Sequence, residues 1–150
     1  EAKDPYIKGH SDRVSAYSEL IGKSLGLSAQ DLKTLRIGGL FHDIGKGVTT
    51  YFNKEKNDWS ATGHAEEGDI ITRRLLKEES FEMRETICYF VRNHMKPLYV
   101  CESPLGIRDI ITMSCDSIFT DFCNLKNLII LKKCDSKKLL SHFYFLLKNI

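Results

Sequence analysis

Long apolar runs, paired cysteine motifs and low-complexity segments are all missing from this sequence of 150 residues. No stretch approaches the roughly 18 apolar residues of a transmembrane helix, so we expect no membrane partner. Proline and glycine contribute only 3 and 10 residues. They follow no period, which excludes fibrous and disordered classes. We therefore expect residues 1–150 to form a single soluble domain.

The five cysteines are odd in number and form no CxxC pair. A signal-peptide pattern is also missing from the first residues, so we expect free thiols and a cytoplasmic protein. The first residue is Glu rather than Met. This start predicts a processed chain or a domain excised from a longer protein.

Apolar residues recur at helical spacing along most of the chain, whereas sustained strand alternation is missing. We therefore predict an all-α bundle of about six to seven helices. The first helix is expected to bury one stripe, and a second helix, capped by Ser28 with Asp31, is expected to bury another. The stripes are Val14, Tyr17, Leu20, Ile21 and Leu25 in the first helix, and Leu32, Leu35 and Leu40 in the second.

Further helices complete the predicted bundle. A third starts near His64, a fourth follows Ser80, a fifth covers about residues 105–122, and the lysine-rich end forms one or two more. Residues 47–63 show no period and are long for a connection, so we expect a lid over a site. The fourth helix is expected to bury Met83, Ile87, Val91 and His94 on one stripe.

His42 and Asp43 are neighbours at the end of the second predicted helix. Adjacent helical side chains point about 100° apart, so this imidazole and carboxylate can converge on one metal ion. A lone histidine is more often a core or surface residue than a ligand. Three further histidines near helix ends or on apolar faces together favour a metal site. They are His10, His64 and His94.

Two pairs of motifs carry a family resemblance. The first is GHSDRV at residues 9–14 with GLFHDIGK at residues 39–46, and the second is GHAEEG at residues 63–68 with VRNHM at residues 91–95. The pattern resembles the HD superfamily of metal-dependent phosphohydrolases over roughly residues 4–136. The resemblance implies an HD-domain helical bundle with His10, His42 and Asp43 as metal ligands. It also implies that His64 and His94 hold a second ion or the substrate phosphate.

Two branches of that superfamily are similar to different parts of the chain. The motifs after residue 45 are most similar to HD domains attached to bacterial tRNA nucleotidyltransferases. The first fifty residues look more like cyclic-di-GMP phosphodiesterases of the HD-GYP type. A single His94 replaces the paired histidines of that type, and no Gly-Tyr-Pro loop precedes Glu102. Cyclic-di-GMP hydrolysis is therefore not expected.

A distal aspartate completes the ligand set that the resemblance implies, and two residues are candidates. Asp116 sits where short HD hydrolases place theirs, whereas Asp135 sits where the tRNA nucleotidyltransferase-like group has it. If a helix continues through it, Asp135 lies on a leucine stripe, where a carboxylate needs a partner such as a metal. Asp116 lies on a more polar face, where water suffices. We prefer Asp135, with the capping of the last helix as its alternative role.

Two cations lie close to the predicted ligands. Lys46 is expected to reach a substrate phosphate, and Arg13, one turn after His10, is expected to do the same or to orient Asp43. Ordinary roles are the alternatives. A lysine beyond a helix C-terminus complements the helix dipole, and a surface arginine needs no further function.

These residues alone favour a metal-assisted hydrolase, and the resemblance to the HD superfamily implies that it is a metal-dependent phosphohydrolase. One or two divalent ions of Mn, Fe, Ni, Co or Zn would lower the pKa of bound water and supply hydroxide for in-line attack. Asp43 is the expected acceptor of the water's proton. The resemblance supplies the substrate class: a phosphorylated small molecule, a nucleotide, a cyclic nucleotide or an RNA-end phosphate, cleaved as a phosphomonoester or phosphodiester.

Two other hypotheses compete with this one. The fold could serve as a sensory, RNA-binding or nucleotide-binding module of a larger protein with little turnover, and the lysine-rich residues 126–150 are compatible with that role. The chain could also be a plain helical interaction domain with incidental histidines. Metal content separates the last hypothesis from the others, and turnover separates the first from the second.

Overall fold

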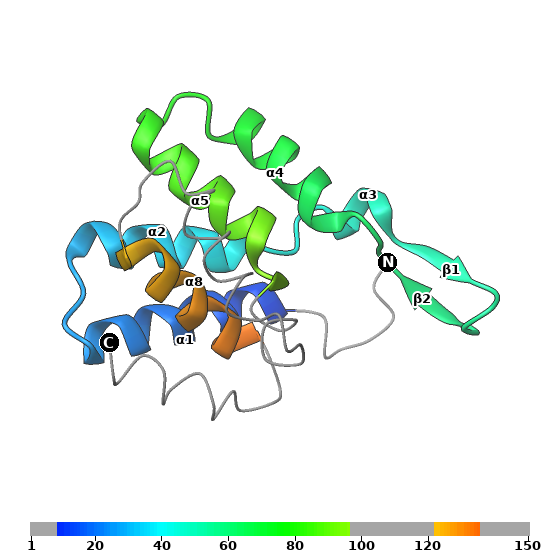
Figure 1. Ribbon diagram of the computed structural model, residues 1–150, viewed down its shortest axis with the longest axis horizontal. Helices are drawn as coiled ribbons and strands as arrows, with labels where there is room; N and C mark the ends of the chain where they lie inside the picture. The colour runs from blue at the N-terminus through cyan, green and yellow to red at the C-terminus, as the bar shows by residue number, and fades with distance from the viewer. Residues whose placement is uncertain (1–8, 97–121, 136–150) are drawn as a thin grey trace.

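The computed structural model describes residues 9–96 and 122–135. This part of the chain forms a group of packed helices and one small sheet (Figure 1). The mostly helical architecture confirms the predicted all-α class. The fifth predicted helix, residues 105–122, lies outside the described residues except at its last position. The longer helices are α1 (His10–Ser24), α2 (Ala29–Phe41), α4 (His64–Leu75), α5 (Phe81–Asn93) and α8 (Phe122–Asp135).

Helix α1 packs against α2 through small residues, and the predicted stripe of α1 was wrong at three of its five positions, whereas Val14 is buried and Ile21 packs against the core. Its buried residues are Val14, Ser15, Ser18 and Gly22. Of the predicted stripe, Tyr17, Leu20 and Leu25 are 54%, 64% and 45% exposed. The backbones approach closely, since a Cβ on Gly39 would stand only 2.6 Å from the Cα of Ser15. Close contact selects small side chains, so apolar residues alone located only part of the buried face of α1.

Helix α5 contacts α2, α4 and α8, and its predicted buried stripe is confirmed. A neighbouring residue of α5, Phe90, is fully buried in the main core with residues from the other helices. The predicted cap of α2 is confirmed as well, because the Ser28 hydroxyl accepts a hydrogen bond from the Asp31 amide at 3.1 Å. The core partners of Phe90 include Val14 of α1, Leu35 of α2, and Leu128 and Leu131 of α8.

The segment predicted to be an irregular lid is a short helix followed by a hairpin. Helix α3 (Lys46–Thr49) leads into strands β1 (Tyr51–Asn53) and β2 (Asp58–Ser60), which pair antiparallel with Phe52 opposite Trp59. The hairpin projects away from the packed helices (Figure 1). None of the helices in the described ranges is long and apolar enough to cross a lipid bilayer.

Candidate metal centre

The predicted ligands within the described residues all lie at helix ends, and these ends meet in space. Side chains at a helix end can point beyond the helix, so the ends of several helices can contribute to one site. In chain order, the residues are His10 at the start of α1, His42 and Asp43 after α2, His64 at the start of α4, His94 after α5 and Asp135 at the end of α8.

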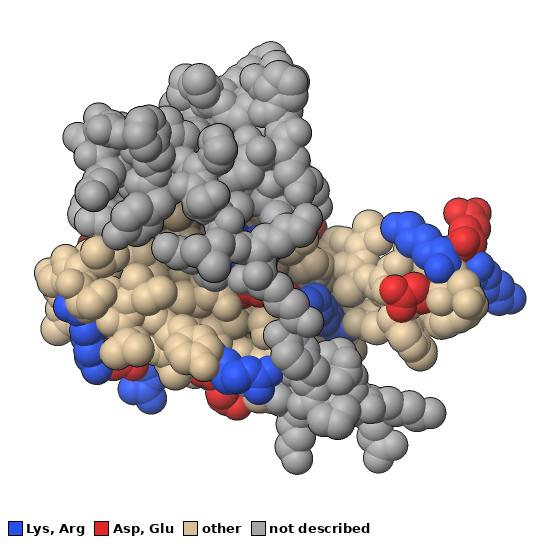
Figure 2. Space-filling model, turned by 90° about the horizontal axis from the view of Figure 1, so that it is seen from below, with Lys and Arg blue, Asp and Glu red and all other residues tan. Residues whose placement is uncertain are grey.

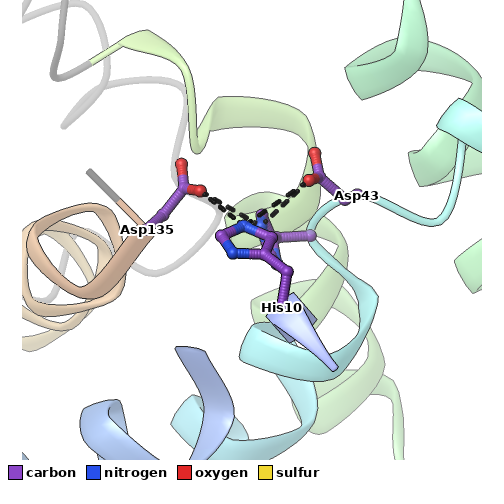
Figure 3. A group of neighbouring side chains, drawn as sticks. His10, Asp43 and Asp135 are labelled. Atoms are coloured by element: carbon purple, nitrogen blue, oxygen red, sulfur yellow. Dashed lines mark hydrogen bonds and ion pairs between the residues drawn. The ribbon is translucent and has the colours of Figure 1, made fainter. Parts of the chain in front are cut away.

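Four of these residues form what we call the first ligand group, His10, His42, Asp43 and Asp135, whose ligand atoms lie within 4.8 Å of one another. Nε2 of His10 is 3.0 Å from Oδ1 of Asp135 and 3.8 Å from Oδ2 of Asp43 (Figure 3). Nε2 of His42 is 3.3 Å and 3.4 Å from the same Asp43 and Asp135 oxygens. Two imidazoles and two carboxylates therefore surround one small volume.

The second ligand group consists of Asp43, His64 and His94, and it shares Asp43 with the first. The Nε2 atoms of His64 and His94 are 3.1 Å apart, and each is 3.6 Å from Oδ1 of Asp43. Asp43 thus presents Oδ2 to the first group and Oδ1 to the second. One carboxylate between two sets of donors is an arrangement suited to a pair of metal ions.

Three of the histidines are oriented by the backbone in the same way. Nδ1 of His42, His64 and His94 lies 2.8, 2.7 and 2.7 Å from the carbonyl oxygen three residues earlier. A carbonyl can only accept, so Nδ1 carries the proton and donates it. This tautomer leaves the Nε2 lone pair free for a metal, as in many histidine metal sites. The carbonyl oxygens are those of Gly39, Ala61 and Val91.

The unpaired donor atoms fit a divalent transition metal. Nε2 of His42 is fully buried and has no hydrogen-bond partner among the described residues, although carboxylate oxygens lie 3.3 and 3.4 Å away. Leaving a buried polar atom without a partner costs about 1–3 kcal/mol. A cation in the first ligand group would satisfy this atom, and mixed imidazole and carboxylate donors suit Mn, Fe, Co, Ni or Zn.

Burial and charge act in opposite directions in the first ligand group. Burial lowers the pKa of His42, but the carboxylates of Asp135 and Asp43 outweigh burial and raise it to about 9. Burial likewise raises the pKa of both carboxyls, but contact with His42 outweighs it and holds both pKa values well below the usual range. The ionised carboxylates attract a divalent cation, which would compete with the proton on His42.

In the second ligand group, burial rather than charge has the larger effect on the pKa of a histidine. Burial is the largest effect on His94 and lowers the pKa of its imidazole, although contact with Asp43 acts the other way. His94 is only 1% exposed. Its neutral form is the one that binds a metal ion.

Each of the two carboxylates also pairs with a lysine. Lys46 donates to Oδ2 of Asp43 at 2.6 Å, and Lys132 donates to Oδ2 of Asp135 at 2.5 Å. Lys46 is predicted from the sequence to reach a substrate phosphate, but its ammonium group here contacts Asp43. Lys132, which is only 4% exposed, was not among the predicted site residues. The position of Lys132, one helical turn before Asp135, was the available signal.

The remaining predicted site residues have different outcomes. Arg13 is an exposed residue of α1, and its guanidinium lies beside Gly9. Asp116, the alternative distal aspartate, lies outside the described residues. The structure therefore places Asp135 beside the histidines and gives no placement for Asp116.

Comparisons with known proteins point to one family. The sequence matches the family described as HD domain over residues 7–121. The 3'3'-cGAMP-specific phosphodiesterase 3 of Vibrio cholerae is 50% identical over 46 residues, which are 31% of this chain and 10% of that protein. The CC-adding tRNA nucleotidyltransferase of Thermus thermophilus is 40% identical over 65 residues, which are 42% of this chain and 15% of that protein. No solved structure matched the chain significantly.

The extent of these matches decides what they support. The aligned segments span only a small share of both relatives, so they are similar to parts of larger proteins. The family match covers most of the chain and includes both ligand groups except Asp135. On this evidence the chain belongs to the HD domain family.

Proposed function

We propose that this protein is a metal-dependent phosphohydrolase with a two-ion centre. The observation that carries the proposal is the Asp43 carboxylate, whose Oδ2 faces His10 and His42 and whose Oδ1 faces His64 and His94. Membership of the HD domain family and similarity to a phosphodiesterase support the same chemistry.

In this proposal each ligand group holds one divalent transition-metal ion. Such ions supply an acidified water as the nucleophile and positive charge that stabilises the reacting phosphate. Asp43 would fix the separation of the two sites, because one of its oxygens faces each ligand group. Lys132 donates to Oδ2 of Asp135 and so leaves Oδ1 directed at His10.

Two exposed cations are proposed to bind substrate phosphate. The side chain of Lys46 is 48% exposed, so it can turn from Asp43 to a phosphate once other cations compensate the carboxylate. Arg13 follows His10 by one helical turn and is also exposed. Its guanidinium could bind a phosphate through two parallel hydrogen bonds.

The proposed substrates are nucleotide-type phosphate esters. The names of the two relatives refer to a cyclic dinucleotide and to tRNA. These names support a nucleotide, cyclic nucleotide or RNA-end phosphate over an unrelated phosphate ester. Both phosphomonoesters and phosphodiesters belong in the first substrate screen.

One observation favours a second candidate function, a nucleotide-binding or RNA-binding module with little turnover. Lys46 and Lys132 each pair with a carboxylate of the first ligand group, and such pairs neutralise charge without a metal ion. A protein that keeps these pairs would bind metal weakly. It would use the fold for recognition alone.

Elemental analysis of the purified protein is the first test. We expect close to two transition-metal ions per chain after loading with Mn²⁺, and almost none in a His42→Ala/Asp43→Ala variant. The loaded protein is then incubated with nucleoside monophosphates, 2′,3′-cyclic nucleotides and linear dinucleotides. Metal binding without phosphate release from any of them would favour the binding module, and failure to bind any transition metal would refute the two-ion centre.

A further inference from the structure

The hairpin begins and ends at the second ligand group. It lies between Asp43 and His64 in the sequence. Gly45, just before α3, is so close to His64 that a Cβ would clash with the His64 carbonyl oxygen. After β2, the Ala61 carbonyl accepts the hydrogen bond from Nδ1 of His64 at 2.7 Å. Both ends of the hairpin are therefore fixed at the rim of the candidate metal centre.

Two aromatic side chains lie opposite each other on one face of the hairpin. Phe52 and Trp59 are cross-strand partners, so their side chains share a face. The rings meet edge to face, with centroids 5.6 Å apart and an interplanar angle of 78°. Phe52 is 47% exposed and Trp59 is 67% exposed. A cluster of exposed aromatic surface of this kind often marks a binding site.

The size of this aromatic pair favours a nucleobase over a protein as its partner. A specific protein interface buries about 800 Å² on each partner and uses about 20–30 residues a side. The hairpin, by contrast, spans only residues 51–60. A base needs no more than one exposed aromatic ring to stack on. The area therefore suits a flat ligand better than a folded partner.

The hairpin carries two lysines that can contact the phosphates of a nucleic-acid strand, balanced in charge by two acidic residues. The turn between the strands carries Lys54 and Lys56, together with Glu55, and Asp58 begins β2. Figure 2 shows basic and acidic side chains at the projecting end of the molecule. Lysines beside stacked bases can contact the neighbouring phosphates. Lys46, at the start of α3, adds a further cation at the base of the hairpin.

We propose that the hairpin stacks a base of a single-stranded nucleic acid whose phosphate lies at the metal centre. This inference rests on the proposed function and deepens it, because it names an oligonucleotide rather than a mononucleotide as the substrate. The hairpin projects from the helices (Figure 1). A base on Trp59 therefore belongs to a different nucleotide from the one at the ions. Stacking tolerates all bases, so the surface contributes affinity with little sequence preference.

Trp59 is the only tryptophan of the chain, so its fluorescence reports directly on the proposed surface. The purified protein is titrated with AMP, with a dinucleotide of adenosine and with an oligoadenylate of six nucleotides. Phosphorothioate linkages in the two longer ligands prevent hydrolysis. We expect the hexamer to quench the fluorescence at a concentration at least about tenfold lower than AMP, the scale of one added base stack.

Variants test the same surface through the anisotropy of a fluorescein-labelled hexamer. Trp59→Ala is expected to weaken binding about tenfold, the scale of one lost base stack, and Phe52→Ala to weaken it by a smaller factor. Leu75→Ala is the matched control, since Leu75 is 58% exposed at the end of α4 and should bind as the wild type does. Circular dichroism verifies that each variant is folded.

Three results would overturn the inference: no quenching by any adenylate, unchanged hexamer binding by Trp59→Ala, or a dimer in sedimentation that Trp59→Ala abolishes. The last result would mean that a second copy of the chain covers the rings. Hydrolysis of bis(p-nitrophenyl) phosphate by the metal-loaded wild type tests the proposed function separately. Hexamer binding without any such hydrolysis would support the hairpin surface and count against the phosphohydrolase.

Discussion

The two ligand groups are assembled from very different parts of the chain. Apart from the shared Asp43, the second group uses the ends of α4 and α5, which are neighbours in sequence. The first group joins α1 to α8, and its His10 and Asp135 are in contact across 125 positions of sequence. It also contains two carboxylates, both paired with lysine. The second group therefore depends on local helix pairing, whereas the first depends on the docking of α8 and on charge.

Substitution of Asp43 should remove both ions at once and so erase the difference between the groups. We expect Asp43→Asn to lose both metal ions and to lower hydrolysis at least about 100-fold, because several kcal/mol of charge stabilisation are lost. Elemental analysis and initial rates measure the two effects. Glu78→Gln is the control, since its side chain is 88% exposed. An Asp43→Asn protein that keeps both ions would contradict the shared-carboxylate assignment.

A pair of variants should separate the groups. Asp135→Asn is expected to empty the first group and His64→Ala the second, so each protein should retain close to one ion per chain. Hydrolysis should fall in both, by a smaller factor than in Asp43→Asn, because one ion and its activated water remain. Metal titration calorimetry measures the stoichiometry. Loss of both ions in either variant would mean that the two groups bind metal as one unit.

Lys132 should contribute more to the free energy of unfolding when the first ligand group holds no metal ion than when it holds one. Lys132→Met removes the ammonium group that pairs with Asp135, and we expect the free energy of unfolding of the metal-free protein to fall by about 1–3 kcal/mol. A bound ion compensates the same carboxylate, so Mn²⁺ should reduce that loss. Urea unfolding with and without Mn²⁺ measures it.

Lys46→Met provides the comparison, because Lys46 is half-exposed and surface pairs contribute only about 0–1 kcal/mol. An equal loss from Lys132→Met in the presence and absence of Mn²⁺ would show that Lys132 acts through packing and not through the charge of Asp135.

The smallest expected effect on metal binding concerns the Arg73–Glu85 pair, which supports the second group. Arg73 of α4 donates to Glu85 of α5 at 2.5 Å and 2.7 Å, and this pair joins the helices that carry His64 and His94. Glu85→Gln should lower the free energy of unfolding by about 1–2 kcal/mol. It should weaken the second ion only a few-fold and leave the first unchanged.

The stabilisation contributed by the Arg73–Glu85 pair should change with pH in a defined direction. Burial raises the pKa of Glu85, but the hydrogen bond from Arg73 outweighs it and lowers the pKa below its usual value. A depressed folded-state pKa means that the stabilisation is complete above the unfolded value of about 4.3 and is lost as the pH falls further. Urea unfolding should show a difference between wild type and Glu85→Gln near neutral pH that shrinks below about pH 4. A constant difference would contradict this origin.

Much of the candidate site was accessible from the sequence because its residues lie where local rules apply. The adjacent His42 and Asp43 stand out in any reading, and the buried stripe of α5 follows simple helical periodicity up to His94. Asp135 was favoured because a carboxylate among leucines needs a partner. Its contact with His10 needed the three-dimensional structure, since it depends on how α8 docks against α1.

The errors and omissions have physical causes too. The buried face of α1 combines Val14 with two serines and a glycine that permit close backbone contact, so hydrophobicity located only part of it. The hairpin was missed because three-residue strands are too short for alternation to be seen. Lys132 gave little signal, because a lysine in a helix is usually a solvated residue.

The bonds from Nδ1 of three histidines to carbonyls three residues earlier have a consequence for metal uptake. Each bond lies within a single turn of the chain, so the ring is oriented before any ion arrives. Metal binding therefore does not have to order these imidazoles, which lowers its entropic cost. A donor set held in place before binding selects among metals by ligand type and geometry. The metal it carries in a cell would therefore depend on these and on supply rather than on affinity alone.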